Sequence, residues 1–141
     1  MDREPCCTRT EEHESIRLQL VQVGQGVRAT LDDDAAFMQA RERALEFCTE
    51  QLLAHLEHDE TWLVRADGHS ETRLLAQAMR SEIRAIGGCV SMIADASTGW
   101  EAVAAIHTTH VLFAVHASHE SLLVPVLARQ ADDDVTQRQG R

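Results

Sequence analysis

Residues 114–127 read AVHASHESLLVPVL and indicate a helix whose buried face carries two polar groups. His116 and Glu120 are four residues apart, so in a helix their side chains lie one turn apart on the same face. That face otherwise points apolar side chains toward the core. A carboxylate among buried apolar groups is costly unless it is paired or binds a metal, and a neighbouring imidazole is the natural co-ligand. The stretch therefore predicts an imidazole and a carboxylate that face the interior together.

A second stretch, residues 52–63, repeats the pattern as LLAHLEHDETWL. His55 and Asp59 have the same four-residue spacing, and Glu60 follows directly. Imidazole nitrogen and carboxylate oxygen together suit iron or manganese, and carboxylates can bridge two metal ions. Near the chain start, His13 lies on the same helical face as the apolar residues that follow it. We therefore predict a shared metal site inside the protein, with a hydrogen-bonded pair near the surface as the alternative for His55 and Asp59.

The surrounding sequence predicts four helices separated by helix breakers. Gly24 and Gly26 are expected to end the first helix, and a polar connection around Gly68 separates the second helix from the third. Thr98 and Glu101 have the spacing of a capping box at the start of the fourth helix. The predicted helices span about residues 10–23, 30–64, 71–94 and 98–128.

The second predicted helix has a clear inward stripe. Its members recur at helical spacings and are Met38, Leu45, Cys48, Leu52, His55 and Asp59. Four helices with short connections and almost no alternation of period two predict an all-α fold. We expect an up-down-up-down four-helix bundle over residues 10–129. Residues 1–9 and 130–141 contain little apolar sequence, and we expect disordered terminal segments there.

The charge of the chain restricts its partners. Its 141 residues include 13 Lys+Arg and 23 Asp+Glu, a formal net charge of −10. This field opposes nucleic acid, so we expect no nucleic-acid partner. No run approaches the roughly 18 consecutive apolar residues of a membrane span, and the start has no signal-peptide pattern. We therefore expect a cytoplasmic protein with no membrane partner that is monomeric or weakly homo-oligomeric.

The arrangement of these stretches resembles the haemerythrin-like, or HHE cation-binding, family. The matching pieces are HESIRLQL (residues 13–20), LLAHLEHDETWL, MRSEIRAI (residues 79–86) and AVHASHESLLVPVL, in the family's order and approximate spacing. The resemblance covers roughly residues 10–128. It implies a haemerythrin-like bundle with a non-haem diiron site that binds or reduces oxygen, peroxide or nitric oxide. The implied metal ligands are His13, His55, Asp59 or Glu60, His116 and Glu120.

The sequence departs from the family pattern at two positions. Asp59 stands where the family has the longer glutamate, so Glu60 is an alternative ligand. Ile83 stands where the family has a histidine just after the glutamate of the third helix, and isoleucine cannot bind a metal. Either water, Glu82 or another side chain completes the coordination, or one metal ion is lost. We therefore expect two non-haem iron ions from the family pattern, with a single iron or zinc ion as the alternative.

Two interpretations of function follow. The first is a haemerythrin-like iron protein that binds or reduces a small oxidant or diatomic ligand, with enzymatic turnover left open. The second is a degenerate bundle, metal-free or zinc-binding, that acts as an interaction or sensing module. The other histidines are expected outside the ligand set, with His58 and His119 at the rim of the site and His107 and His110 facing solvent or a partner.

Overall fold

The structure is a computed structural model that describes residues 6–140, with side chains from residue 9 onward. This part of the chain is almost entirely helical and contains no β-strand. In chain order the helices are α1 (Cys6–Arg28), α2 (Asp34–Phe47), α3 (Leu53–Leu63), α4 (Ser70–Asp95) and α5 (Gly99–Gln139). The π-helical segment Cys48–Leu52 joins α2 to α3, and the 3-10 turn Val64–Gly68 leads from α3 toward α4.

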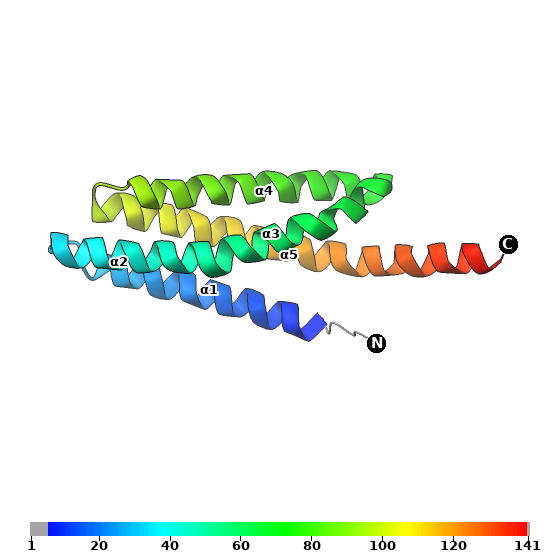
Figure 1. Cartoon of the computed structure of the whole chain (residues 1–141), viewed down its shortest axis with the longest axis horizontal. Coiled ribbons are helices and arrows are strands. Elements are labelled where there is room, and N and C mark those ends of the chain that lie inside the picture. The colour runs from blue at the N-terminus through cyan, green and yellow to red at the C-terminus, as the bar shows by residue number, and fades with distance from the viewer. Residues whose placement is uncertain (1–5, 141) are drawn as a thin grey trace.

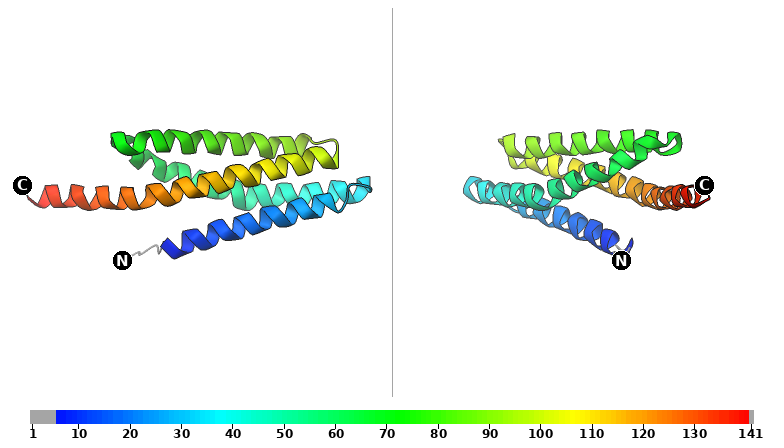
Figure 2. Two further views of the ribbon diagram at one scale, coloured as in Figure 1. Left: turned by 180° about the vertical axis from the view of Figure 1, so that it is seen from behind. Right: turned by 45° about the vertical axis from the view of Figure 1, so that its right-hand side comes forward.

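These elements form four antiparallel rods (Figure 1). α1 runs in one direction, α2 and α3 return together as one rod, α4 reverses again, and α5 runs back (Figures 1 and 2). α5 packs along both α4 and α1. The all-α, four-helix bundle predicted from the sequence is confirmed.

The core of the bundle consists of two apolar clusters with a polar zone between them along its length. The larger cluster includes Leu56 and Phe113, and the smaller one includes Trp62 and Leu123. On α3 and on α5, the buried members of the two imidazole–carboxylate pairs lie next to or between these apolar positions. Ile83 of α4 is half-buried and packs against both clusters. The apolar packing therefore seals the polar zone from both ends.

The first helix extends beyond the predicted limits at both of its ends. It begins at Cys6 and runs through Gly24 and Gly26 to Arg28, so the expected stop at residue 23 is wrong. A glycine inside a helix costs only about 1 kcal/mol relative to alanine, which packing can offset. A Cβ at Gly24 would lie 3.3 Å from Cγ2 of Ile106, so this glycine allows α1 to approach α5 closely. Of the disordered segment expected over residues 1–9, residues 1–5 lie outside the described part.

The last helix also differs from the prediction. α5 continues through Pro125 to Gln139, so the disordered tail predicted for residues 130–141 is helical as far as residue 139. Residues 131–140 are all exposed, and α5 extends past the other rods (Figure 1). Adding a turn to an existing helix needs no new nucleus, so a polar segment can continue a helix that it could not start. The apolar content of the tail was therefore a poor guide to its structure.

The helix starts follow the sequence more closely. The Thr98 hydroxyl accepts a hydrogen bond from the Glu101 backbone N–H at 3.2 Å, and the Glu101 carboxylate accepts one from the Ser97 N–H at 2.9 Å. The predicted cap of the fourth helix is thus confirmed. Asp33 caps α2 by accepting from the Ala36 N–H at 3.1 Å, which satisfies one of the donors that every helix start leaves open.

The π-helical segment shifts the buried face of the second rod by one residue. Before it the buried positions are Phe37, Ala40, Ala44 and Phe47, and after it they restart at Cys48 and continue through Leu52, His55 and Asp59. The predicted stripe is correct from Cys48 onward, Leu45 is partly buried against the core, and Met38 is wrong because it is 44% exposed. If a regular α-helical period is extended backward from Cys48, each position that it marks as buried falls one residue after the position that is buried in the structure. The extra residue of the π turn is the physical reason.

One helix of the described chain, α5, is long and apolar enough to span a membrane by length and composition. The core helix of a soluble bundle passes the same test, and α5 carries buried polar side chains that face the other helices. The predicted absence of a membrane partner and the cytoplasmic location stay predictions.

Deleting Glu50, an exposed residue of the π-helical segment, should leave a folded protein. The deletion removes the extra residue, so the rod continues as an α-helix and both flanking faces keep their directions. Deleting Glu57, which is exposed in α3, should instead rotate Asp59 and Trp62 by about 100° out of the core. Thermal unfolding followed by circular dichroism checks this. We expect cooperative unfolding for the first variant only, and loss of cooperativity in both would contradict the role assigned to the π turn.

Candidate metal centre

Four buried side chains from two helices meet in the polar zone of the bundle. His55 and Asp59 come from α3, and His116 and Glu120 come from α5. One potential ligand atom of each lies within 4.8 Å of those of the other three. The four-residue spacing places each pair on one helical face, and the antiparallel packing of the rods brings the two faces together. These four residues are called the central group below.

The central group is linked by short polar contacts. Nε2 of His116 lies 2.7 Å from Oδ2 of Asp59, and Nε2 of His55 lies 3.2 Å from the same oxygen. Nε2 of His55 is also 3.6 Å from Oε2 of Glu120. Both imidazoles therefore direct the same ring nitrogen toward the carboxylates at the centre.

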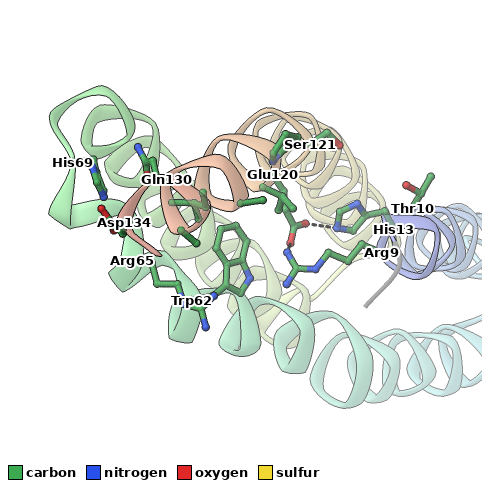
Figure 3. A pocket seen from close by; sticks show the side chains of 15 residues that line it. Arg9, Thr10, His13, Trp62, Arg65, His69, Glu120, Ser121, Gln130 and Asp134 are labelled. Carbon is green, nitrogen blue, oxygen red and sulfur yellow. Dashed lines mark hydrogen bonds and ion pairs between the residues drawn. The ribbon is translucent and has the colours of Figure 1, made fainter. Parts of the chain in front are cut away.

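His13 joins this group from α1. Its Nε2 atom contacts Oε2 of Glu120, so a third imidazole faces the centre from another rod (Figure 3). Three buried atoms at this place have no hydrogen bond of acceptable geometry, namely Nε2 of His13, Nε2 of His55 and Oε2 of Glu120. Buried polar atoms are nearly always paired, so a group of unsatisfied atoms that face one another needs an explanation. A metal ion bound between them would satisfy all three.

The outer ring nitrogens of two of these histidines bind carboxylates. Nδ1 of His55 donates to Oε1 of Glu12 at 2.9 Å, and Nδ1 of His116 donates to Oε2 of Glu82 at 3.2 Å. The other oxygen of Glu82 contacts Nδ1 of His119. Metal-binding histidines commonly donate their second N–H to a carboxylate, which fixes the ring and leaves Nε2 to bind the metal. His55 and His116 both have this arrangement.

The proton inventory of these rings supports the same conclusion. A neutral imidazole has a single N–H, yet His55 and His116 each have a carboxylate at both ring nitrogens. Each ring can therefore donate to both of its carboxylates only if Nε2 carries a second proton, and otherwise a metal ion must bind at that nitrogen. The same geometry is suited to both.

Asp59 is oriented by one further residue of its own helix. The indole N–H of Trp62 donates to Oδ1 of Asp59 at 3.1 Å, which leaves Oδ2 directed toward the two histidines. Glu120 is held from the opposite side by Arg9, whose Nη1 lies 3.4 Å from Oε1. The guanidinium of Arg9 also lies over the Trp62 ring, 4.9 Å from its centroid. Each central carboxylate thus has one oxygen bound outside the group.

Five of the six residues proposed from the sequence as metal ligands come together here, and one does not. His13, His55, Asp59, His116 and Glu120 converge, whereas Glu60 is exposed and lies outside the group. A step of one residue along a helix rotates the side chain by about 100°, so Asp59 and Glu60 cannot both face the centre. Glu60 is therefore not the carboxylate that α3 contributes.

The third helix places Glu82, not residue 83, against the centre. Glu82 is buried beside His116, and Ile83 lies on the apolar side of α4. His119 is half-buried and touches Glu82, as expected for a rim residue, whereas His58 is exposed and lies outside the group. His107 is exposed and His110 is half-buried.

Three residues that contact the candidate ligands, namely Arg9, Glu12 and Trp62, were not predicted from the sequence. Trp62 is three residues after Asp59, a spacing that places both on one helical face and could have revealed it. Glu12 is 43 residues from its partner His55 and is exposed, so no local pattern indicates it. Only the position of α1 beside the rod formed by α2 and α3 defines that contact.

The charges of the central group alter the acidities of its members. Burial opposes protonation of His55, but its close contacts with the carboxylates of Asp59, Glu120 and Glu12 outweigh burial and raise the pKa of His55 to about 10. Burial also opposes ionisation of Asp59, but hydrogen bonds from His116 and His55 keep the pKa of Asp59 well below its usual range. Without a metal, His55 is therefore a cation and Asp59 an anion at neutral pH.

A cavity of about 470 Å³ opens beside the central group (Figure 3). His13 and Glu120 form part of its wall, and Trp62 forms another part. A second cavity of about 510 Å³ lies between the C-terminal half of α1 and the N-terminal half of α5, and Trp100 lines it. Only the first of these two cavities is lined by a residue of the central group, Glu120, so it gives a small molecule a route to the centre.

Comparison with known proteins adds no assignment: the chain matches no family model, no curated protein and no solved structure. The fold and the central group described above are therefore the basis for a functional proposal.

The metal-free protein should lose stability as the pH rises from about 7 to 10. A group whose pKa is raised on folding stabilises the protein fully below its unfolded pKa, about 6.5 for histidine, and that contribution disappears as pH passes the folded pKa. The chain contains no lysine and no tyrosine, and burial raises the pKa of the Cys48 thiol to about 11, so that this cysteine adds a loss of stability mainly above pH 9. Melting temperatures in a chelator across this range check the prediction.

His55→Gln and His107→Gln provide the matched comparison for this experiment. The first removes the titrating group and should flatten the alkaline decline, and the second replaces an exposed histidine of α5 and should leave the decline unchanged. Parallel curves for the wild type and His55→Gln would show that another group causes the decline.

Proposed function

We propose that this chain is a haemerythrin-like non-haem iron protein that binds or reduces a small oxidant or diatomic ligand such as oxygen, peroxide or nitric oxide. The observation that carries the proposal is the set of inward nitrogen and oxygen atoms of His13, His55 and Glu120, which are buried, face one another and form no hydrogen bond of acceptable geometry. They face the His116–Asp59 contact within one polar zone. The donor types, imidazole and carboxylate, are those that non-haem iron sites use.

The residues that would hold iron come from three rods. His13, His55 and His116 would supply nitrogen, and Asp59 and Glu120 would supply oxygen. Iron bound by such ligands can bind and reduce oxygen-like molecules when a coordination position stays open. α4 presents Glu82 and no imidazole to the centre, which favours an incompletely coordinated site. A measurement of the metal content would show whether the site holds two iron ions, as in the family pattern, or one.

The other residues of the chain prepare this site in defined ways. Glu12 and Glu82 accept hydrogen bonds from the Nδ1 atoms of His55 and His116, so that both rings are already oriented toward the centre. Trp62 fixes the direction of Asp59. Phe113 contacts the rings of His13 and His55 edge to face, at centroid distances of 5.8 and 5.9 Å, and closes the centre on its apolar side. The cavity beside Glu120 leaves the other side accessible.

One observation favours the second interpretation, a bundle without iron. Asp59 and His116 are in direct contact at 2.7 Å, and a proton on His55 together with the guanidinium of Arg9 offsets the charges of Asp59 and Glu120 without a metal. A charged histidine network of this kind would suit a metal-free interaction or sensing module. A single zinc ion on the same ligands would be a structural site. Metal analysis distinguishes these alternatives.

Ferrous iron added anaerobically to the metal-free protein should bind at the central group and quench the fluorescence of Trp62. Trp62 touches Asp59, whereas the chain's other tryptophan, Trp100, is 66% exposed and lines the other cavity. The variant Trp100→Phe therefore reports on the centre, and Trp62→Phe reports on the remote site. We expect quenching in the first variant only, one or two iron ions per chain by elemental analysis, and a higher melting temperature, because a ligand that binds the folded state stabilises it.

His116→Ala and His107→Ala are the matched pair for this measurement. Both remove an imidazole from α5, but only His116 faces the centre, and His107 is exposed. Loss of an inner ligand should weaken iron binding by more than the roughly 10- to 100-fold that outer-shell changes cost, while His107→Ala binds as the wild type does. Less than about 0.2 iron per chain in the wild type would refute the iron proposal, and zinc at one ion per chain would replace it with the structural alternative.

A further inference from the structure

The cavity beside the central group is much larger than an oxygen or nitric oxide molecule requires. Its volume is about 470 Å³. A water molecule in the liquid occupies about 30 Å³, and sites for small organic molecules measure roughly 300–1,000 Å³. The space is therefore of a size for an organic molecule.

The lining of this cavity combines apolar side chains with a few polar ones. One wall is formed by α5, with Val124, Pro125 and Leu127, and the indole of Trp62 faces this wall from α3. His13 and Glu120 are where the cavity meets the central group. An apolar body bound between α5 and Trp62 would therefore have one end beside the inward imidazole and carboxylate. This combination of apolar walls and few polar groups is typical of small-molecule sites.

Two arginines place positive charge in this cavity although the whole chain carries a net charge of −10. Arg9 lies over Trp62 and Arg65 approaches from the 3-10 turn, and both line the cavity (Figure 3). Of the two carboxylates in the lining, Glu120 is bound by His13 and Arg9, and Asp134 is exposed on the projecting part of α5. Guanidinium groups bind carboxylates with directed, charge-assisted hydrogen bonds.

We propose that this cavity binds a small organic anion, an apolar carboxylate whose chain or ring lies between Trp62 and α5 and whose charge is held by Arg65 and Arg9. The cavity itself is a property of the protein with or without a metal. That the bound molecule acts as the substrate or co-ligand of an iron centre rests on the function proposed above. The two claims are therefore tested separately.

Decanoate is a suitable probe, with decyltrimethylammonium as a cation of similar length. Isothermal titration calorimetry on the metal-free protein should show binding of decanoate and binding of the cation that is at least about tenfold weaker, the effect of one charge-assisted contact. Decanoate should also change Trp62 fluorescence in the Trp100→Phe variant. Equal affinity for the anion and the cation would overturn the proposal.

Two variants locate the binding. Arg65→Gln should weaken decanoate binding by about tenfold or more, through loss of one charge-assisted contact. Ala131→Phe should fill the cavity and prevent binding, because Ala131 lines it from an exposed position of α5. Ala104→Phe, also exposed on α5 but lining the second cavity, is the matched control and should bind decanoate as the wild type does.

The outcomes of these measurements separate the two proposals. Unchanged decanoate affinity in Ala131→Phe, with circular dichroism showing a folded variant, would place the anion elsewhere and overturn the inference. Decanoate binding that is lost in Ala131→Phe supports the inference even if the protein takes up no iron, and iron uptake without decanoate binding supports the function proposed above alone.

Discussion

The requirement that dominates this protein is the balance of charge in its interior. Asp59 and Glu120 are buried inside a helical bundle, where an isolated carboxylate is far less stable than in water. Each must therefore be matched by positive charge, and the histidines of three rods converge to supply it. Removing one member would leave another charge buried without a partner, which is more damaging than loss of a surface ion pair. The polar zone and the apolar clusters around it therefore form one cooperative unit.

This balance can be reached in two ways that share the same geometry. In one, protons on the imidazoles neutralise the carboxylates, and the raised pKa of His55 shows how strongly the site favours that state. In the other, a metal ion replaces the protons on Nε2, while the Nδ1 protons of His55 and His116 stay hydrogen-bonded to Glu12 and Glu82. Metal binding would therefore compete with protonation, as it does wherever ligands must first lose a proton. The prepared orientation of the rings reduces the rearrangement that this exchange would need.

The central group was largely predictable because it depends on spacing within single helices. A histidine and a carboxylate four residues apart share a face whatever the tertiary structure, and the absence of strand patterns allowed only a helical fold. Contacts that depend on packing between helices were not predictable: Glu12 reaches His55 from another rod, and Glu82, which the sequence offered only as one of several possible ligands, instead contacts the outer nitrogen of His116. The continuation of α5 into the C-terminal segment was also not predicted, because composition alone does not show where an existing helix ends.

The extra residue between Cys48 and Leu52 has a practical consequence for anyone who transplants this centre into a designed scaffold. In a regular helix with the same amino acids from Phe37 to Asp59, the buried positions of only one half could face the core. Those of the other half would be rotated toward solvent. The grafted unit must therefore start after the irregular turn, or else include it whole. Within the native chain, the same π turn divides the rod into two segments, α2 and α3. The buried positions of each segment can be redesigned separately, because the two segments do not share one continuous helical period.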